Sequence, residues 1–92
     1  MKPEDALSPL GRLEPGTLNV IYTSPDGAWS LARMVWDGAP RLGCRWNGDI
    51  NNPADKGNPS SRGHGTWFIL PDELVPVVME SIKNLPQVHA YA

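Results

Sequence analysis

The stretch Thr17–Trp46, TLNVIYTSPDGAWSLARMVWDGAPRLGCRW, decides the fold of this 92-residue chain. Ser24-Pro25-Asp26-Gly27 favours a type I turn, with Pro at the second position and Gly where the backbone needs a positive φ. Asp37-Gly38 is a preferred pair for the two-residue type I′ turn of a β-hairpin. The two turns separate three runs in which side chains alternate with the period of two that is typical of β-strands: 17–23, 28–36 and 40–46. The stretch therefore predicts an antiparallel β-meander.

The third run has one apolar face and one face with two arginines. Its alternation assigns Leu42, Cys44 and Trp46 to one side of the strand. We expect that apolar set to face the core, and the opposite set to face away: Arg41, Gly43 and Arg45.

A long polar segment follows the meander. Residues 47–65 are rich in Asn, Asp, Gly, Pro and Ser, and Ile50 is their single large aliphatic residue. Loops longer than about 12–15 residues are uncommon in compact domains and are usually functional or disordered. The next run, 66–70 (TWFIL), predicts a fourth, largely buried strand.

The C-terminal part predicts one helix. Pro71, Asp72 and Glu73 suit a helix start, because proline fits the first turn and acids complement the helix dipole there. Pro76 then lies either in the first turn or at a kink, and Pro86 ends the helix. The apolar stripe that should cover the sheet comprises Leu74, Val75, Val78, Met79, Ile82 and Leu85.

These elements predict one α+β domain at 17–86: an antiparallel β-meander of four strands followed by one C-terminal helix packed on the sheet. Residues 1–16 are rich in Pro, Gly and charge and predict a flexible N-terminal arm, which could dock through Leu7, Leu10 and Leu13. Residues 87–92 form a C-terminal tail that either frays or adds a fifth, edge strand.

Charge and cysteine content bound the possible partners and the compartment. The formal charge is −2, yet residues 28–70 hold five basic side chains against three acidic ones, which permits a small anionic partner. The single cysteine, Cys44, cannot form an intrachain disulfide and suits a reducing, cytoplasmic location. Residues 1–16 lack the apolar core of a signal peptide, and no apolar run approaches the ~20 residues of a membrane span.

Catalytic and metal-binding patterns are weak. A nucleophilic cysteine or serine would need a histidine to activate it, and the spacing of the two histidines, His64 and His89, matches no catalytic motif. Cys44 is therefore interpreted as a small core residue. Asp49, Asn51 and Asp55 faintly resemble a calcium loop, but a proline replaces one ligand and the closing Glu is missing. We expect no catalytic residue, metal or cofactor.

The segment 58–65 is the candidate anion-binding site. Its glycines allow backbone N–H groups to line a concavity, and a guanidinium can bind an anion through two bonds. The alternative is an ordinary flexible connection. The side chains that would take part are Ser60, Ser61, Arg62 and His64.

Four tryptophans are many for a sheet covered by one helix, and some should be exposed unless the chain self-associates. An exposed indole beside Arg41 or Arg45 would suit stacking of single-stranded bases. Alternatively, all four belong to the core or to a dimer interface: Trp29, Trp36, Trp46 and Trp67.

Two family resemblances follow from these motifs. Residues 36–40 (WDGAP) with Arg45-Trp46 resemble the second hairpin of the single-stranded-DNA-binding transcriptional-coactivator family, which implies a β-meander, one C-terminal helix, dimerisation and DNA binding. Residues 58–63 (NPSSRG) with 66–68 (TWF) resemble small proteins of mobile, integron-type gene cassettes, which implies a bacterial accessory protein.

The leading hypothesis is therefore a non-enzymatic binding or interaction protein, forming a homodimer. The alternatives are a single-stranded nucleic-acid-binding protein, and an enzyme or binder acting on an anionic small molecule at residues 58–65.

Overall fold

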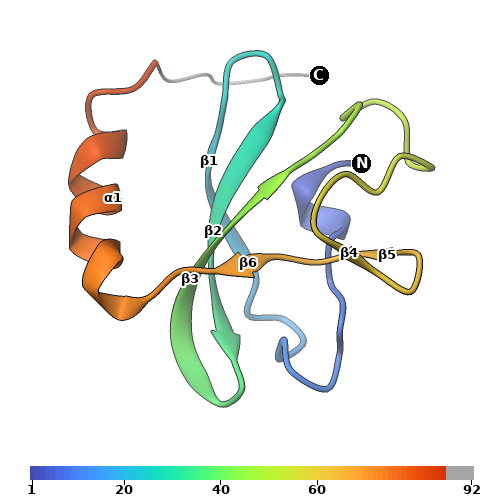
Figure 1. Cartoon of the computed structure of the whole chain (residues 1–92), viewed down its shortest axis with the longest axis horizontal. Helices are drawn as coiled ribbons and strands as arrows, with labels where there is room; N and C mark the ends of the chain where they lie inside the picture. Colours follow the sequence, from blue (N-terminus) through green and yellow to red (C-terminus); the bar gives the residue numbers. More distant parts are fainter. Residues whose placement is uncertain (87–92) are drawn as a thin grey trace.

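The fold was analysed in a computed structural model that describes residues 1–86; the tail 87–92, with His89, lies outside the described residues. A short 3-10 helix, η1 (Pro3–Asp5), precedes the first strand, and a second, η2 (Asp72–Leu74), leads into α1 (Val75–Ile82) (Figure 1). The six strands between them are β1 (Asn19–Thr23), β2 (Trp29–Trp36), β3 (Ala39–Trp46), β4 (Ser60–Ser61), β5 (His64–Gly65) and β6 (Phe68–Ile69).

The architecture is α+β, as the sequence predicts. Four antiparallel strands form one sheet in the order β1-β2-β3-β6, and β4 and β5 form a separate two-stranded ribbon. Both predicted turns are present: Gly27 has φ 76°, and Asp37 and Gly38 have φ 52° and 80°. The ribbon β4-β5 was not predicted, because it is two residues per strand inside a polar loop.

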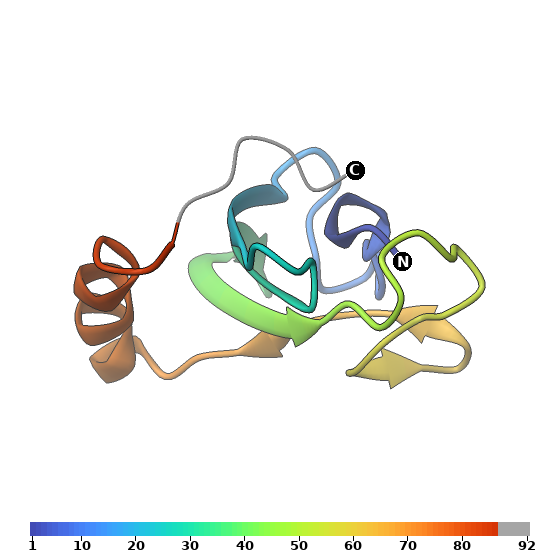
Figure 2. The same ribbon diagram turned by 90° about the horizontal axis from the view of Figure 1, so that it is seen from above.

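The sheet is the middle of three layers. Figures 1 and 2 place it between helix α1 on one side and the N-terminal residues on the other. Strand pairing assigns each side chain to one of these sides, since residues paired across a sheet share a face. The arm face carries Ser30, Ala32, Met34, Gly43, Arg45 and Ile69, and the helix face carries Tyr22, Trp29, Leu31, Leu42, Cys44, Trp46 and Phe68.

The sequence predicts a flexible arm at residues 1–16 that could dock through its leucines, and the structure packs these residues on the sheet with Leu13 buried. Leu13 bridges to Trp36 at the end of β2, and Trp67 donates its indole N–H to the carbonyl of Ala6 at 2.8 Å. The arm thereby completes the main buried cluster: Met1, Ala6, Leu13, Ala32, Met34 and Trp67. The apolar residues of the arm have no periodic spacing, so the sequence did not indicate which of its leucines the sheet would bury.

Docking of the arm reverses part of the prediction for β3. The set expected to face away includes Gly43 and Arg45, and both are buried beneath the arm. In the set expected in the core, only Leu42 is buried, whereas Trp46 is exposed. The arm covers one face of the sheet and helix α1 covers part of the other. The alternation of apolar residues along β3 therefore did not predict which of its side chains would be buried.

Arg45 is the most unusual buried residue, because it is 2% exposed and its guanidinium forms no ion pair with a carboxylate of residues 1–86. It donates to the carbonyls of Thr66 and Lys56 and, at 3.2 Å, to the side-chain oxygen of Asn47. The guanidinium carbon also lies 5.8 Å from the centre of the Trp67 ring. Burial lowers the pKa of Arg45. The carbonyl and amide oxygens and the face of the Trp67 ring stabilise the buried cation in place of water.

Asn47 extends this network to the rest of the chain. Its amide N–H₂ donates to the Gly27 carbonyl at 3.0 Å and to the Ser30 hydroxyl at 2.9 Å. Its backbone carbonyl accepts from the amino group of Met1 at 2.8 Å. The end of β3 therefore joins the first turn, β2, the long loop and the N-terminal residues.

Helix α1 lies over one end of the helix face. Arg41 binds Asp72 at 2.7 Å before the helix, and Tyr22 donates its hydroxyl to the carbonyl of Pro86 after it, also at 2.7 Å.

Pro76 lies in the first helical turn, as one of the two predicted arrangements requires. No helix residue is fully buried; the half-buried stripe is Val75, Val78, Met79 and Ile82. Among the described residues, no helix has the length and apolarity of a membrane span.

The polar loop after β3 is ordered by its own side chains. The carboxylate of Asp55 accepts from the backbone N–H groups of Asp49 at 2.9 Å and Gly57 at 3.0 Å. Asn52 makes a similar short-range turn to Ala54. The side chain of Ile50 packs against Gly27.

Replacing Arg45 tests the role assigned to its guanidinium. Arg45→Met removes three buried donors and leaves the carbonyls of Thr66 and Lys56 unpaired, so the free energy of unfolding should fall by about 2–4 kcal/mol. Urea unfolding followed by tryptophan fluorescence measures the change. Arg41→Met breaks an exposed ion pair and should cost less than about 1 kcal/mol; equal losses in the two variants would contradict the assignment.

Candidate functional site

The largest exposed side chains of the sheet gather on its helix face. Trp46 is 57% exposed and Phe68 49% exposed. Phe68 pairs with Cys44 across β3 and β6, and Trp46 pairs with Trp29 across β2 and β3. Because paired residues share a face, these four form one continuous surface, which we call the aromatic patch: Trp29, Cys44, Trp46 and Phe68.

The patch is open because the helix covers only the other end of this face. The start of α1 lies beside β3 near Pro40 and Leu42, where Val75 and Pro76 line a hollow with them. Leu42 is 1% exposed as a result. An eight-residue helix is too short to reach both ends of the sheet, so the half that carries Trp46 and Phe68 stays uncovered.

The remaining tryptophans have partners within the protein. Trp67 is buried beneath the arm. Trp36 is half-buried against the main core, and the Arg12 guanidinium carbon lies 5.9 Å from the centre of its ring. The Trp29 ring is half-buried with its centre 5.1 Å from that of Tyr22. Of the four predicted aromatic candidates, only Trp46 is exposed.

The predicted cations do not gather beside this indole. Arg45 lies on the opposite face and its guanidinium is engaged by buried acceptors. Arg41 is also on the arm face, and it is paired with Asp72. The structure therefore does not bring Arg41 and Arg45 together with an exposed tryptophan.

The predicted anion-binding residues lie together on the β4-β5 ribbon. Ser60, Ser61, Arg62 and His64 are all exposed. Ser61 pairs with His64, so Arg62 and Gly63 form a two-residue turn, and both have positive φ, 52° and 78°. A turn of this type normally has Asn, Asp or Gly at its first position, as at Asp37, and arginine there carries a conformational cost. Arg62 is exposed at this turn.

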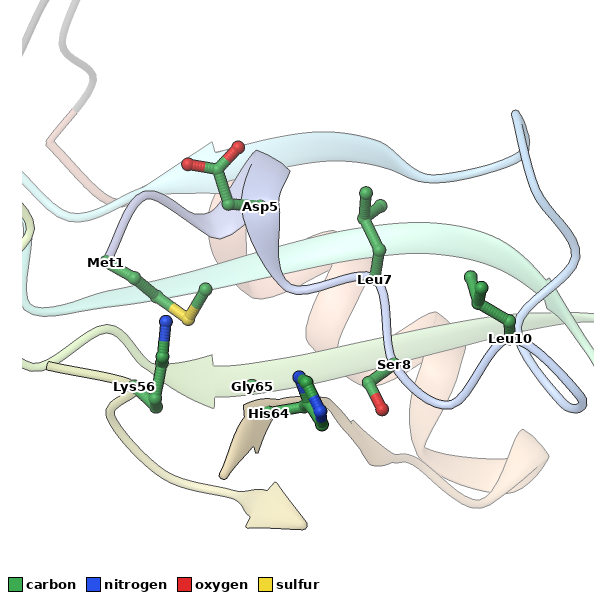
Figure 3. Close-up of a pocket in the computed structure, with 8 residues that line it drawn as sticks. All are labelled: Met1, Asp5, Leu7, Ser8, Leu10, Lys56, His64 and Gly65. Atoms are coloured by element: carbon green, nitrogen blue, oxygen red, sulfur yellow. The ribbon is translucent and has the colours of Figure 1, made fainter. Parts of the chain in front are cut away.

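His64 also borders a pocket between the ribbon and the N-terminal residues (Figure 3). The pocket combines side chains from the arm, the long loop and β5, and its lining residues are Met1, Asp5, Leu7, Ser8, Leu10, Lys56, His64 and Gly65. Of these residues, the sequence indicated only His64 as a binding candidate, because only the tertiary fold brings the arm to β5.

The described residues offer little for nucleophilic or metal chemistry. Burial raises the pKa of the half-buried Cys44 thiol, which disfavours the thiolate that a nucleophile needs. Within residues 1–86, no three His, Cys, Asp or Glu side chains lie close enough to hold a metal ion. In the loop considered for calcium, the Asp55 carboxylate is engaged by backbone N–H groups.

Comparison of the chain with protein-family models, with curated proteins and with solved structures finds no match. The two family resemblances noted from short motifs therefore stay predictions.

The turn at Arg62 makes a stability prediction. Arg62→Asn should raise the free energy of unfolding by about 0.5–1 kcal/mol, because asparagine tolerates positive φ better than arginine does. Thermal unfolding measures the gain. Ser61→Asn, one residue earlier, has no positive φ to relieve and serves as the control. A lower melting temperature for Arg62→Asn would show that the arginine side chain stabilises the turn.

The Asp55 loop makes a pH prediction. Hydrogen bonds from the backbone N–H of Asp49, then Gly57, lower the pKa of Asp55 in the folded state. Its stabilising effect is therefore present above the ordinary carboxyl pKa of about 4 and is lost as the pH falls through the lower folded value. Melting temperatures between neutral pH and pH ~2 should fall less steeply in Asp55→Asn than in the natural protein. Glu73→Gln, an exposed acid of η2, should keep the natural slope.

Proposed function

We propose that this protein is a non-enzymatic interaction protein that forms a homodimer through the aromatic patch. The observation that carries this proposal is the exposure of Trp46 and Phe68 on one sheet face, 57% and 49% respectively. Large aromatic side chains dominate the energetics of protein interfaces and are enriched there.

The rest of the sheet supports this choice of surface. The helix covers one end of the helix face and the arm covers the opposite face, so most large apolar side chains of the strands have a partner within the chain. The aromatic patch is the part of the sheet that neither cover reaches. A second molecule would bury it and would enlarge the thin core of a 92-residue protein.

A second copy of this chain suits the patch. All four of its members are uncharged, so two copies can meet face to face without opposing like charges. Such a contact is self-complementary, as a two-fold symmetric dimer requires. An acidic net charge does not oppose it, since the acidic residues are concentrated outside 28–70.

Single-stranded nucleic-acid binding has weaker support. Trp46 and Phe68 could stack on bases, but phosphate binding needs nearby cations. Arg45 is buried and Arg41 pairs with Asp72, both on the other face. A role as a bacterial accessory protein of mobile gene cassettes rests on the motif resemblance alone.

Removing the patch tests the dimer. At micromolar concentration, size-exclusion chromatography with light scattering should give twice the mass of one chain for the natural protein. The double variant Trp46→Ser/Phe68→Ser should give the mass of one chain, because both exposed rings are lost. Trp46 and Phe68 are each about half exposed and lie outside the main buried cluster, so circular dichroism should show that the variant remains folded.

A matched control removes apolar surface elsewhere. Leu74 and Val77 are 46% and 61% exposed at the helix, and Leu74→Ser/Val77→Ser should leave the dimer intact. A monomeric natural protein, or a dimer lost equally in both double variants, would contradict the assignment of the patch. Quenching of Trp46 fluorescence by oligonucleotides at low salt, in a monomer, would favour the nucleic-acid alternative.

A further inference from the structure

The pocket at the N-terminal residues, here called the arm pocket, lies on the side of the sheet opposite the aromatic patch. It has a volume of about 390 Å³, within the ~300–1,000 Å³ range of small-molecule sites. Three segments far apart in the sequence form it: the arm, Lys56 of the long loop, and His64 and Gly65 of β5. Met1 and Gly65 close its base, where the Met1 sulfur lies in the space that a side chain on Gly65 would need.

One wall of the arm pocket is apolar and open. Of the three leucines expected to dock the arm, only Leu13 is buried, whereas Leu7 is 45% and Leu10 68% exposed. Figure 3 shows Leu7 and Leu10 extending side by side from the arm. Exposed leucines that line a concavity are typical of a surface that binds an apolar group.

The polar residues of the pocket have unused hydrogen-bonding capacity. The Lys56 ammonium donates to the Pro53 carbonyl at 2.9 Å, which leaves two of its three N–H groups without a protein acceptor in residues 1–86. The side chains of His64 and Ser8, which lie next to each other in Figure 3, make no hydrogen bond within the described residues. Buried Arg45, by contrast, has protein acceptors on three of its nitrogen atoms.

We propose that the arm pocket binds a small monocarboxylate with an apolar chain. Lys56 pairs with the carboxylate, His64 and Ser8 donate hydrogen bonds to it, and the chain lies along Leu7 and Leu10. Asp5 also lines the pocket, and its negative charge disfavours ligands with two or more negative charges. This site differs in position and chemistry from the aromatic patch, so it does not depend on dimer formation.

Titration of the full chain with octanoate tests the site. Nuclear magnetic resonance should show saturable shifts of the backbone amides of Leu10, Lys56 and His64. Octanol lacks the charge and butanoate lacks most of the chain, so each should bind at least tenfold more weakly than octanoate. Inorganic phosphate should not displace octanoate. Equal binding of octanol would overturn the role of Lys56, and equal binding of butanoate would overturn that of the leucine wall.

Single substitutions distinguish this pocket from other sites. Lys56→Gln and Leu10→Ser should each weaken octanoate binding at least tenfold, and neither removes a buried side chain. The matched controls are Lys83→Gln, whose lysine pairs with Glu80 on the helix, and Val77→Ser, which removes a similarly exposed apolar residue. Both controls should bind octanoate unchanged. Absence of shifts at millimolar octanoate, or equal weakening in test and control variants, would overturn the proposal.

Discussion

The buried guanidinium of Arg45 is the constraint on which the rest of the structure depends. A cation taken out of water must find acceptors, and here these are carbonyls of the long loop and of the segment before β6, together with Asn47. Asn47 in turn bonds the first turn, β2 and the amino group of Met1. One strand end thereby orders a polar loop that has little apolar surface of its own to bury.

This network also explains why the N-terminal residues cover the sheet. The same loop provides three carbonyls, from Asn47, Asp49 and Asp55, to the amino group of Met1 at 2.7–2.9 Å. With Met1 in place, Ala6 and Leu13 lie over Met34 and Trp67 and complete the main core. A chain of 92 residues therefore gains a third layer without a second helix.

Two different surfaces remain after the layers are assembled. On the helix face, the short helix leaves aromatic rings open, whereas the two arginines predicted to stand beside an indole, Arg41 and Arg45, lie on the other face. On the arm side, the meeting of arm, loop and ribbon creates a concavity with both apolar and polar walls. The aromatic face and the small mixed pocket differ in chemistry, and the fold places them on opposite sides of one sheet.

The sequence by itself determined the local elements: the strand periods, the turns at Ser24–Gly27 and Asp37-Gly38, and one C-terminal helix. These follow from steric preferences of neighbouring residues. Only the tertiary structure decided that Arg45 is buried and Trp46 exposed, because burial depends on which segment covers each face. It likewise brought Leu7, Leu10, Lys56 and His64 around one pocket, since contacts between residues so far apart leave no periodic signal along the chain.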